Sequence, residues 1–157
     1  MSDITPLEIR VGKIVAITKH PDADKLYIEQ IDCGEEGGPR TIVSGLVPYC
    51  SETDLLHKKV LVLCNLKPRP LQGVLSHGMV LCASDQTHEH VDPVTPPAAS
   101  SVGELVYFRG HVSDPKPPGN AAVKAFKRVA GVANFDGEPF MTKSGPCTTI
   151  ICDGKVS

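Results

Sequence analysis

The chain has 157 residues, with 16 basic and 18 acidic side chains and a formal net charge of -2. This length suits one ordinary domain, or a small domain with an appended piece. A net charge near zero excludes a generally basic nucleic-acid binder. No run approaches the roughly 18 apolar residues of a membrane span, and the N-terminus lacks the regions of a secretory signal. We therefore expect a cytoplasmic protein that does not enter membranes.

In the first half, the order of predicted elements is three strands, one helix and two strands, all short. Ser51 is a good N-cap for the helix, with Glu52 and Asp54 in its first turn and Lys58 and Lys59 at its C-terminal end. Such an order, without a βαβ crossover, favours a mainly β fold: a five-stranded OB-type barrel with a helix between strands 3 and 4. The predicted strands cover residues 10–18, 25–33, 40–44, 60–64 and 79–83.

In the second half, residues 85–101 are polar and proline-rich, which predicts a linker or an extended wrap. A strand is expected over 103–108, a helix over 121–130 with one basic side, and a hairpin after residue 135. We therefore divide the chain into a barrel over residues 1–84 and a C-terminal extension over 85–157, packed against it.

The connection from Asn65 to Met79 has an unusual charge. Between Leu55 and Ser84 there are four lysines and arginines and no acid. Pro68, Pro70 and two glycines predict that this connection is neither helix nor regular strand. In an OB barrel, the connection between strands 4 and 5 borders the ligand face. Its basic side chains favour an anionic ligand, although solvation of a surface loop explains them equally well.

Catalysis is not expected. His20 with Asp22 and Asp24 is the nearest approach to a catalytic group, and it lacks a third member. His88 and His90 form at most a weak metal pair. The six cysteines include no C-x-x-C pair, which indicates buried, reduced thiols rather than a zinc site. We predict no metal and no cofactor.

The scarcity of aromatic residues argues against a general single-strand binder, because such surfaces stack bases on aromatic rings. Recognition of folded RNA by shape and backbone is more compatible with the composition. In that interpretation Asn65, Gln72 and Ser76 donate hydrogen bonds to the RNA, and Met79 packs on a base or sugar.

Several stretches together resemble one family, the tRNA-binding domain of the endothelial monocyte-activating polypeptide II type. This domain is appended to methionyl- and tyrosyl-tRNA synthetases and occurs in synthetase-associated cofactors. The resemblance continues into the C-terminal segment, at 137–140 and 145–147. The main matching stretches are Leu7–Gly12, Lys19–Tyr27, Arg40–Leu46, Val62–Pro68 and Gly73–Met79.

The resemblance implies a non-catalytic module that binds tRNA with little sequence preference and supplies it to an aminoacyl-tRNA synthetase, in cis or in trans. It also implies a monomer, because the C-terminal segment takes the place of a second subunit. A protein-interaction or cytokine-like signalling module of the same fold is the alternative. However, the chain has Arg10-Val-Gly-Lys13 where the family's cytokine peptide reads arginine-isoleucine-glycine-cysteine. The residues expected at the tRNA interface are Lys25, Arg40, Ser44, Asn65, Lys67, Arg69, Gln72, Ser76, His77 and Met79.

Overall fold

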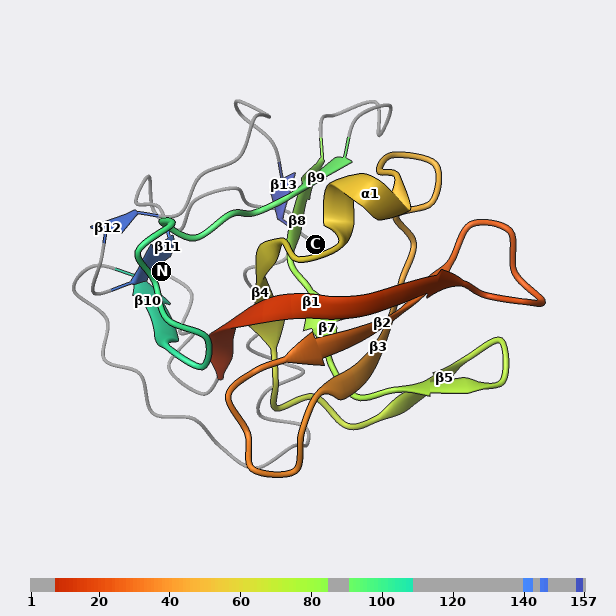
Figure 1. Ribbon diagram of the computed structural model, residues 1–157, viewed down its shortest axis with the longest axis horizontal. Helices are drawn as coiled ribbons and strands as arrows, with labels where there is room; N and C mark the ends of the chain where they lie inside the picture. Colours follow the sequence, from red (N-terminus) through yellow and green to blue (C-terminus); the bar gives the residue numbers. More distant parts are fainter. Residues whose placement is uncertain (1–7, 85–90, 109–139, 143–144, 147–154, 157) are drawn as a thin grey trace.

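The structure is a computed structural model that describes residues 8–84, 91–108, 140–142, 145–146 and 155–156 (Figure 1). The predicted helix 121–130 lies wholly outside these ranges, and the predicted hairpin after residue 135 lies mostly outside them. The described helix is α1 (Glu52–Leu55). The described strands are β1 (Ile9–Lys19), β2 (Tyr27–Asp32), β3 (Arg40–Ser44), β4 (Lys59–Leu63), β5 (Arg69–Leu71), β6 (Val74–Ser76), β7 (Met79–Val80), β8 (Cys82–Ser84), β9 (Val91–Pro93), β10 (Leu105–Phe108), β11 (Phe140–Thr142), β12 (Gly145–Pro146) and β13 (Lys155–Val156).

Strand β1 is the centre of the barrel. Its first half pairs antiparallel with β4 and its second half with β2, and Lys13 pairs with both. A register shift between Ile14 and Ala16 bends the strand after this point. Gly12 lets β1 lie close to side chains of β2 and β4, because a Cβ there would lie 2.7 Å from the Ile31 side chain and 2.9 Å from the Val62 side chain.

The barrel is nearly closed. Strand β2 pairs with β3, and β4 pairs with β7. The remaining gap is bridged where the His77 N–H donates to the Thr41 carbonyl, 2.8 Å away. The predicted OB-like barrel, with its helix between the third and fourth strands, is confirmed.

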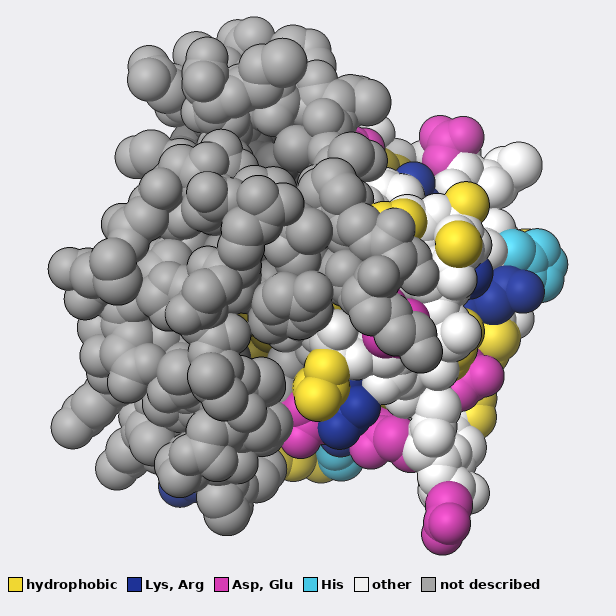
Figure 2. Space-filling view, turned by 90° about the vertical axis from the view of Figure 1, so that its left-hand side faces the viewer, with side chains coloured by type: hydrophobic (Ala, Val, Ile, Leu, Met, Phe, Trp, Pro, Cys, Tyr) yellow, Lys and Arg dark blue, Asp and Glu magenta, His cyan; other side chains and the backbone are white. Residues whose placement is uncertain are grey.

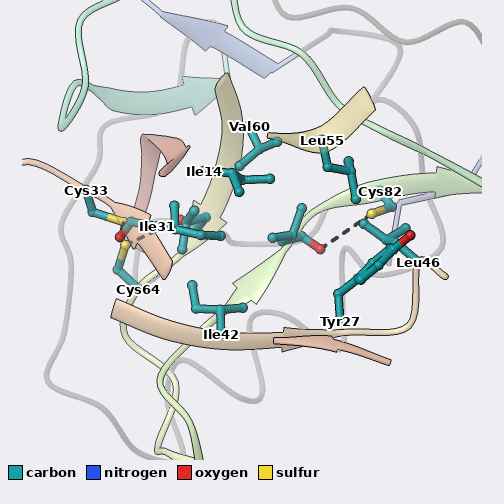
Figure 3. Packing of buried hydrophobic residues seen from close by; sticks show 12 residues of the cluster. Ile14, Tyr27, Ile31, Cys33, Ile42, Leu46, Leu55, Val60, Cys64 and Cys82 are labelled. Atoms are coloured by element: carbon teal, nitrogen blue, oxygen red, sulfur yellow. Dashed lines mark hydrogen bonds between the residues drawn. The ribbon is translucent and has the colours of Figure 1, made fainter. Parts of the chain in front are cut away.

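The barrel interior is filled by alternate residues of these strands, because strand side chains point to opposite faces in turn. Figure 3 shows Ile14, Ile31 and Ile42 packed together in the middle of this cluster, with Tyr27 towards one end. Tyr27 is buried, and its hydroxyl donates to the Cys50 carbonyl at 2.7 Å. This tyrosine is therefore part of the core and does not offer a stacking surface.

Two predicted boundaries were wrong. Helix α1 begins as expected, with the Ser51 hydroxyl accepting from the Asp54 N–H, but it ends at Leu55. Lys58 and Lys59 therefore lie beyond it, and Lys59 opens β4. The predicted fifth strand divides into β7 and β8, because β8 leaves β4 and pairs with β9. Part of the expected proline-rich wrap is thus a strand.

The connection between β4 and β7 is also more regular than predicted. Strands β5 and β6 form an antiparallel hairpin, called the arm below (residues 65–78). Its two-residue turn has left-handed backbone at Gln72 (φ 49°) and Gly73 (φ 83°), as a type I′ turn requires. Pro70 opposes Leu75, one pair away from the turn. That pair does not exchange ladder hydrogen bonds, so the missing proline N–H costs nothing.

Strands from the C-terminal part add to the barrel. Strand β10 lies along the start of β1, pairing Val106 with Ile9, and β13 pairs with β8. Strand β10 confirms the strand predicted over 103–108. Within the described ranges, no helix has the length and apolar character needed to cross a bilayer.

One buried charge has a measurable consequence for folding. Glu29 in β2 is fully buried, and the Ser44 hydroxyl donates to its carboxylate. Burial raises the pKa of Glu29 from 4.5 to about 7, although the Ser44 hydrogen bond opposes this shift. The folded protein therefore favours the protonated acid. The stability that this preference gives is present below the unfolded-state pKa and is lost as the pH rises through about 7.

We expect the free energy of unfolding to fall by about 3 kcal/mol from Glu29 alone between about pH 4.5 and pH 8. Glu29→Gln keeps the shape and a hydrogen-bonding group without the charge, so it removes this part of the pH dependence. Urea unfolding of both proteins across that range measures the difference. Parallel pH curves for wild type and variant would contradict the assignment.

Candidate nucleic-acid interface

The arm is held at its two roots by one side chain. Arg40 Nη1 donates to the carbonyl of Cys64, just before the arm, and to that of His77 near its end, both at 2.8 Å. The other guanidinium nitrogens bind the Glu35 carboxylate at 2.5 and 2.9 Å. These bonds lower the pKa of Glu35 and raise that of Arg40. Arg40 thus positions the arm, and its charge is matched by Glu35.

Two further predicted contact residues also lie inside the structure. Ser76 is 4% exposed, and its hydroxyl accepts from the Val43 N–H and donates to the Gly78 carbonyl, each at 3.0 Å. Asn65 is 3% exposed, and its side-chain oxygen accepts from the Glu8 N–H at 3.0 Å. In this conformation neither group is presented to a ligand. Both fix the arm against the barrel, and their contact with tRNA stays a prediction.

The outer surface of the arm carries the available charge. Lys67 and Arg69 are exposed, as are Gln72 and His77. Among the described residues, Lys67 and Arg69 make no ion pair, whereas Arg10 and Arg40 are paired with Glu8 and Glu35. On the face drawn in Figure 2, basic and acidic side chains likewise lie next to one another. Other described lysines also lack an ion pair, so what distinguishes the arm is that its exposed cations lie in a segment, residues 55–84, that contains no acid.

Beside the arm, Met79 and Ser44 meet at one pocket of about 290 Å³. Tyr49, which is 40% exposed, also lines it. Tyr49 was not among the predicted interface residues, although its position after a proline in the loop that follows β3 could have indicated it. The remaining predicted residue, Lys25, is exposed in the turn before β2. The structure thus joins Ser44 to Met79 and leaves Lys25 on a separate loop.

The groups considered for catalysis have structural explanations where the structure describes them. His20 is buried, and its Nδ1 accepts from the Asp22 N–H at 3.0 Å, which closes the turn after β1. His88 and His90 lie outside the described residues. Within the described part of the chain, no three His, Cys, Asp or Glu side chains gather as metal ligands do.

The comparisons with known proteins agree with this geometry. A family model described as a putative tRNA binding domain matches residues 9–105. A probable methionine–tRNA ligase of Oryza sativa subsp. japonica is 44% identical over 152 residues, which are 92% of this chain and 19% of that protein. The aminoacyl tRNA synthase complex-interacting multifunctional protein 1 of Cricetulus griseus is 38% identical over 154 residues, 92% of this chain and 42% of that protein.

Among solved structures, the C-terminal domain of Plasmodium vivax p43 is similar over 100% of both chains, with a TM-score of 0.88 and 36% identity. The chain spans less than half the length of the two curated relatives. Because the family model covers residues 9–105 and the likeness to p43 extends over the whole chain, the protein belongs to the tRNA-binding domain family.

Proposed function

We propose that this chain is a non-catalytic module that binds tRNA through the arm and supplies it to an aminoacyl-tRNA synthetase, in cis or in trans. The observation that carries this proposal is the pair of unmatched cations, Lys67 and Arg69, on an exposed arm whose roots are fixed. A fixed arm loses little conformational freedom on binding, so its charges act on phosphates without an ordering cost. Tethered tRNA is then held at a high local concentration for the synthetase.

We propose that the arm recognises the shape and the phosphate backbone of the RNA. Lys67 and Arg69 contact phosphates, which position an RNA without reading its sequence. The pocket beside the arm offers the Met79 side chain and the Tyr49 ring, which pack against any base or sugar. Neither kind of contact selects one nucleotide, so this interface has little sequence preference.

The chain is also proposed to be a monomer. The start of β1 is flanked by β4 on one side and by β10 on the other. Both edges of this segment are therefore paired within the chain and cannot add a strand from a second copy. Sedimentation equilibrium should give the mass of one chain, and a dimer mass at micromolar concentration would contradict the proposal.

Binding should depend strongly on salt. If about five phosphates are neutralised, log affinity falls with log salt at a slope of roughly -3.5 to -4.5. Lys67→Glu should weaken binding and reduce the slope by about one, and Met79→Ala should weaken binding without changing the slope. Filter binding of tRNA over a salt series measures both. Lys58→Glu is the control for net charge, because Lys58 follows α1, and Figure 1 shows α1 on the opposite side of β1 from β5.

An affinity that does not change with salt would contradict the electrostatic proposal. If Lys67→Glu and Met79→Ala both bind like the wild type, the arm is not the interface. If Lys58→Glu weakens binding as much as Lys67→Glu, the effect comes from net charge and not from the arm.

Arg40 should act on binding through the arm's position. Arg40→Met removes both root bonds, and hydrogen bonds from a charged donor contribute about 1.5–3 kcal/mol each. We expect lower stability and weaker tRNA binding by the folded protein. Arg10→Met is the control, since Arg10 likewise bonds a carboxylate and a carbonyl, those of Glu8 and Gly103. Arg10→Met should lower stability and leave the affinity for tRNA unchanged. Equal losses of affinity in the two variants would show that Arg40 does not position the arm for tRNA binding.

A further inference from the structure

Two buried thiols face each other at one end of the barrel core. Cys33 follows β2 and Cys64 follows β4, and their side chains are 2% and 4% exposed. Figure 3 shows their sulfur atoms close together, away from Tyr27 and Cys82 at the other end of the cluster. Strands β2 and β4 both pair with β1 and not with each other. The contact between the thiols therefore crosses the inside of the barrel, where no backbone ladder connects the two strands.

The two sulfurs differ in acidity. Each thiol donates to a carbonyl of the strand that it follows, Cys33 to Ile31 and Cys64 to Val62. The neighbouring Cys64 thiol lowers the pKa of Cys33, with a further contribution from the Arg40 guanidinium, and burial opposes both. The contact with Cys33 and burial raise the pKa of Cys64. Burial also raises the pKa of Cys50 and Cys82. Cys33 also adjoins the exposed turn of residues 34–37, so of the two thiols it is the one suited to act as a nucleophile, with Cys64 as its neighbour.

We propose that Cys33 and Cys64 form an oxidisable dithiol site, which hydroperoxides convert to a disulfide between the ends of β2 and β4. The Cys33 thiolate attacks one peroxide oxygen, the O–O bond breaks, and Cys33 becomes a sulfenic acid. The Cys64 sulfur then attacks the Cys33 sulfur and loses its proton, and water leaves. Overall the two thiols give up two electrons and two protons, and hydrogen peroxide is reduced to two molecules of water.

Cys33 lies next to solvent-exposed backbone. Cys33 is followed directly by the exposed turn of residues 34–37. Gly34 and Gly103 both have left-handed backbone and pack closely against each other, since a Cβ on Gly34 would lie 3.0 Å from the Gly103 Cα. In this proposal the oxidant reaches Cys33 from the side of this turn.

A disulfide here would act on the arm. The Cys64 N–H donates to the Glu8 carbonyl, its carbonyl accepts from Arg40, and the next residue is Asn65. The cross-link would therefore add a covalent restraint at the root that Arg40 holds by hydrogen bonds. The site and its chemistry do not depend on tRNA binding.

The test uses the full chain treated with hydrogen peroxide, alkylated, digested without reductant and mapped by mass spectrometry. We expect one linked peptide pair, Cys33 with Cys64, that dithiothreitol reverses. Cys50→Ser should retain it, while Cys33→Ala and Cys33→Val should both lose it. Two replacements of Cys33 guard against a folding defect in either one. Linkage of other cysteines in the folded chain, or free Cys33 after treatment, would overturn the proposal.

A second measurement tests the restraint. Closing the loop between residues 33 and 64 reduces the freedom of the unfolded chain. The oxidised wild type should therefore unfold at a higher urea concentration than the reduced wild type, and the Cys33→Ala midpoint should not respond to peroxide. A linked but less stable protein would show that the thiols cannot join without distorting the barrel.

Discussion

The guanidinium of Arg40 determines where the arm lies. Arg40 is the first residue of β3, and it donates to a carbonyl at each root of the arm. A lysine could not do this, because a single ammonium lacks the planar fork that reaches two carbonyls and a carboxylate at once. The Glu35 carboxylate accepts hydrogen bonds from the other two guanidinium nitrogens of Arg40, so the partly buried positive charge of Arg40 is balanced. The barrel sets the position of Arg40, and Arg40 sets the position of the arm.

Two pairs of basic residues in the described part of the chain differ in how their charge is used. Arg10 and Arg40 form ion pairs within the protein, with Glu8 and Glu35. Substituting either arginine would therefore disturb the fold itself. Lys67 and Arg69 hold their charge towards solvent, and the surrounding segment contains no acid. The small net charge of the chain is therefore compatible with a binding surface, because the charge that matters is local.

The barrel could be predicted from the sequence because its strands have clear apolar runs and its helix has a strong N-cap. The arm could not, because Pro70 reads as a strand breaker unless the pairing register is known. The internal bonds of Ser76 and Arg40 could not be predicted for a similar reason, and their contact with tRNA stays a prediction. A polar residue in a matching motif looks like a ligand contact, and only the fold shows that its partners are Val43, Gly78, Cys64 and His77. Tyr49 was missed because its surroundings depend on β7 and β9, far away in the sequence.

The pairing of Pro70 with Leu75 also matters for how the arm behaves in a crowded solution. An exposed two-stranded ribbon normally presents a row of free N–H groups along its outer edge, and such a row recruits strands from other molecules. On β5 the outward position is Pro70, and Pro68 stands two residues earlier, so neither can donate. The inner edge, on β6, is occupied by β3 through Ser76 and His77. The arm can thus stay exposed for its ligand without becoming a template for self-association.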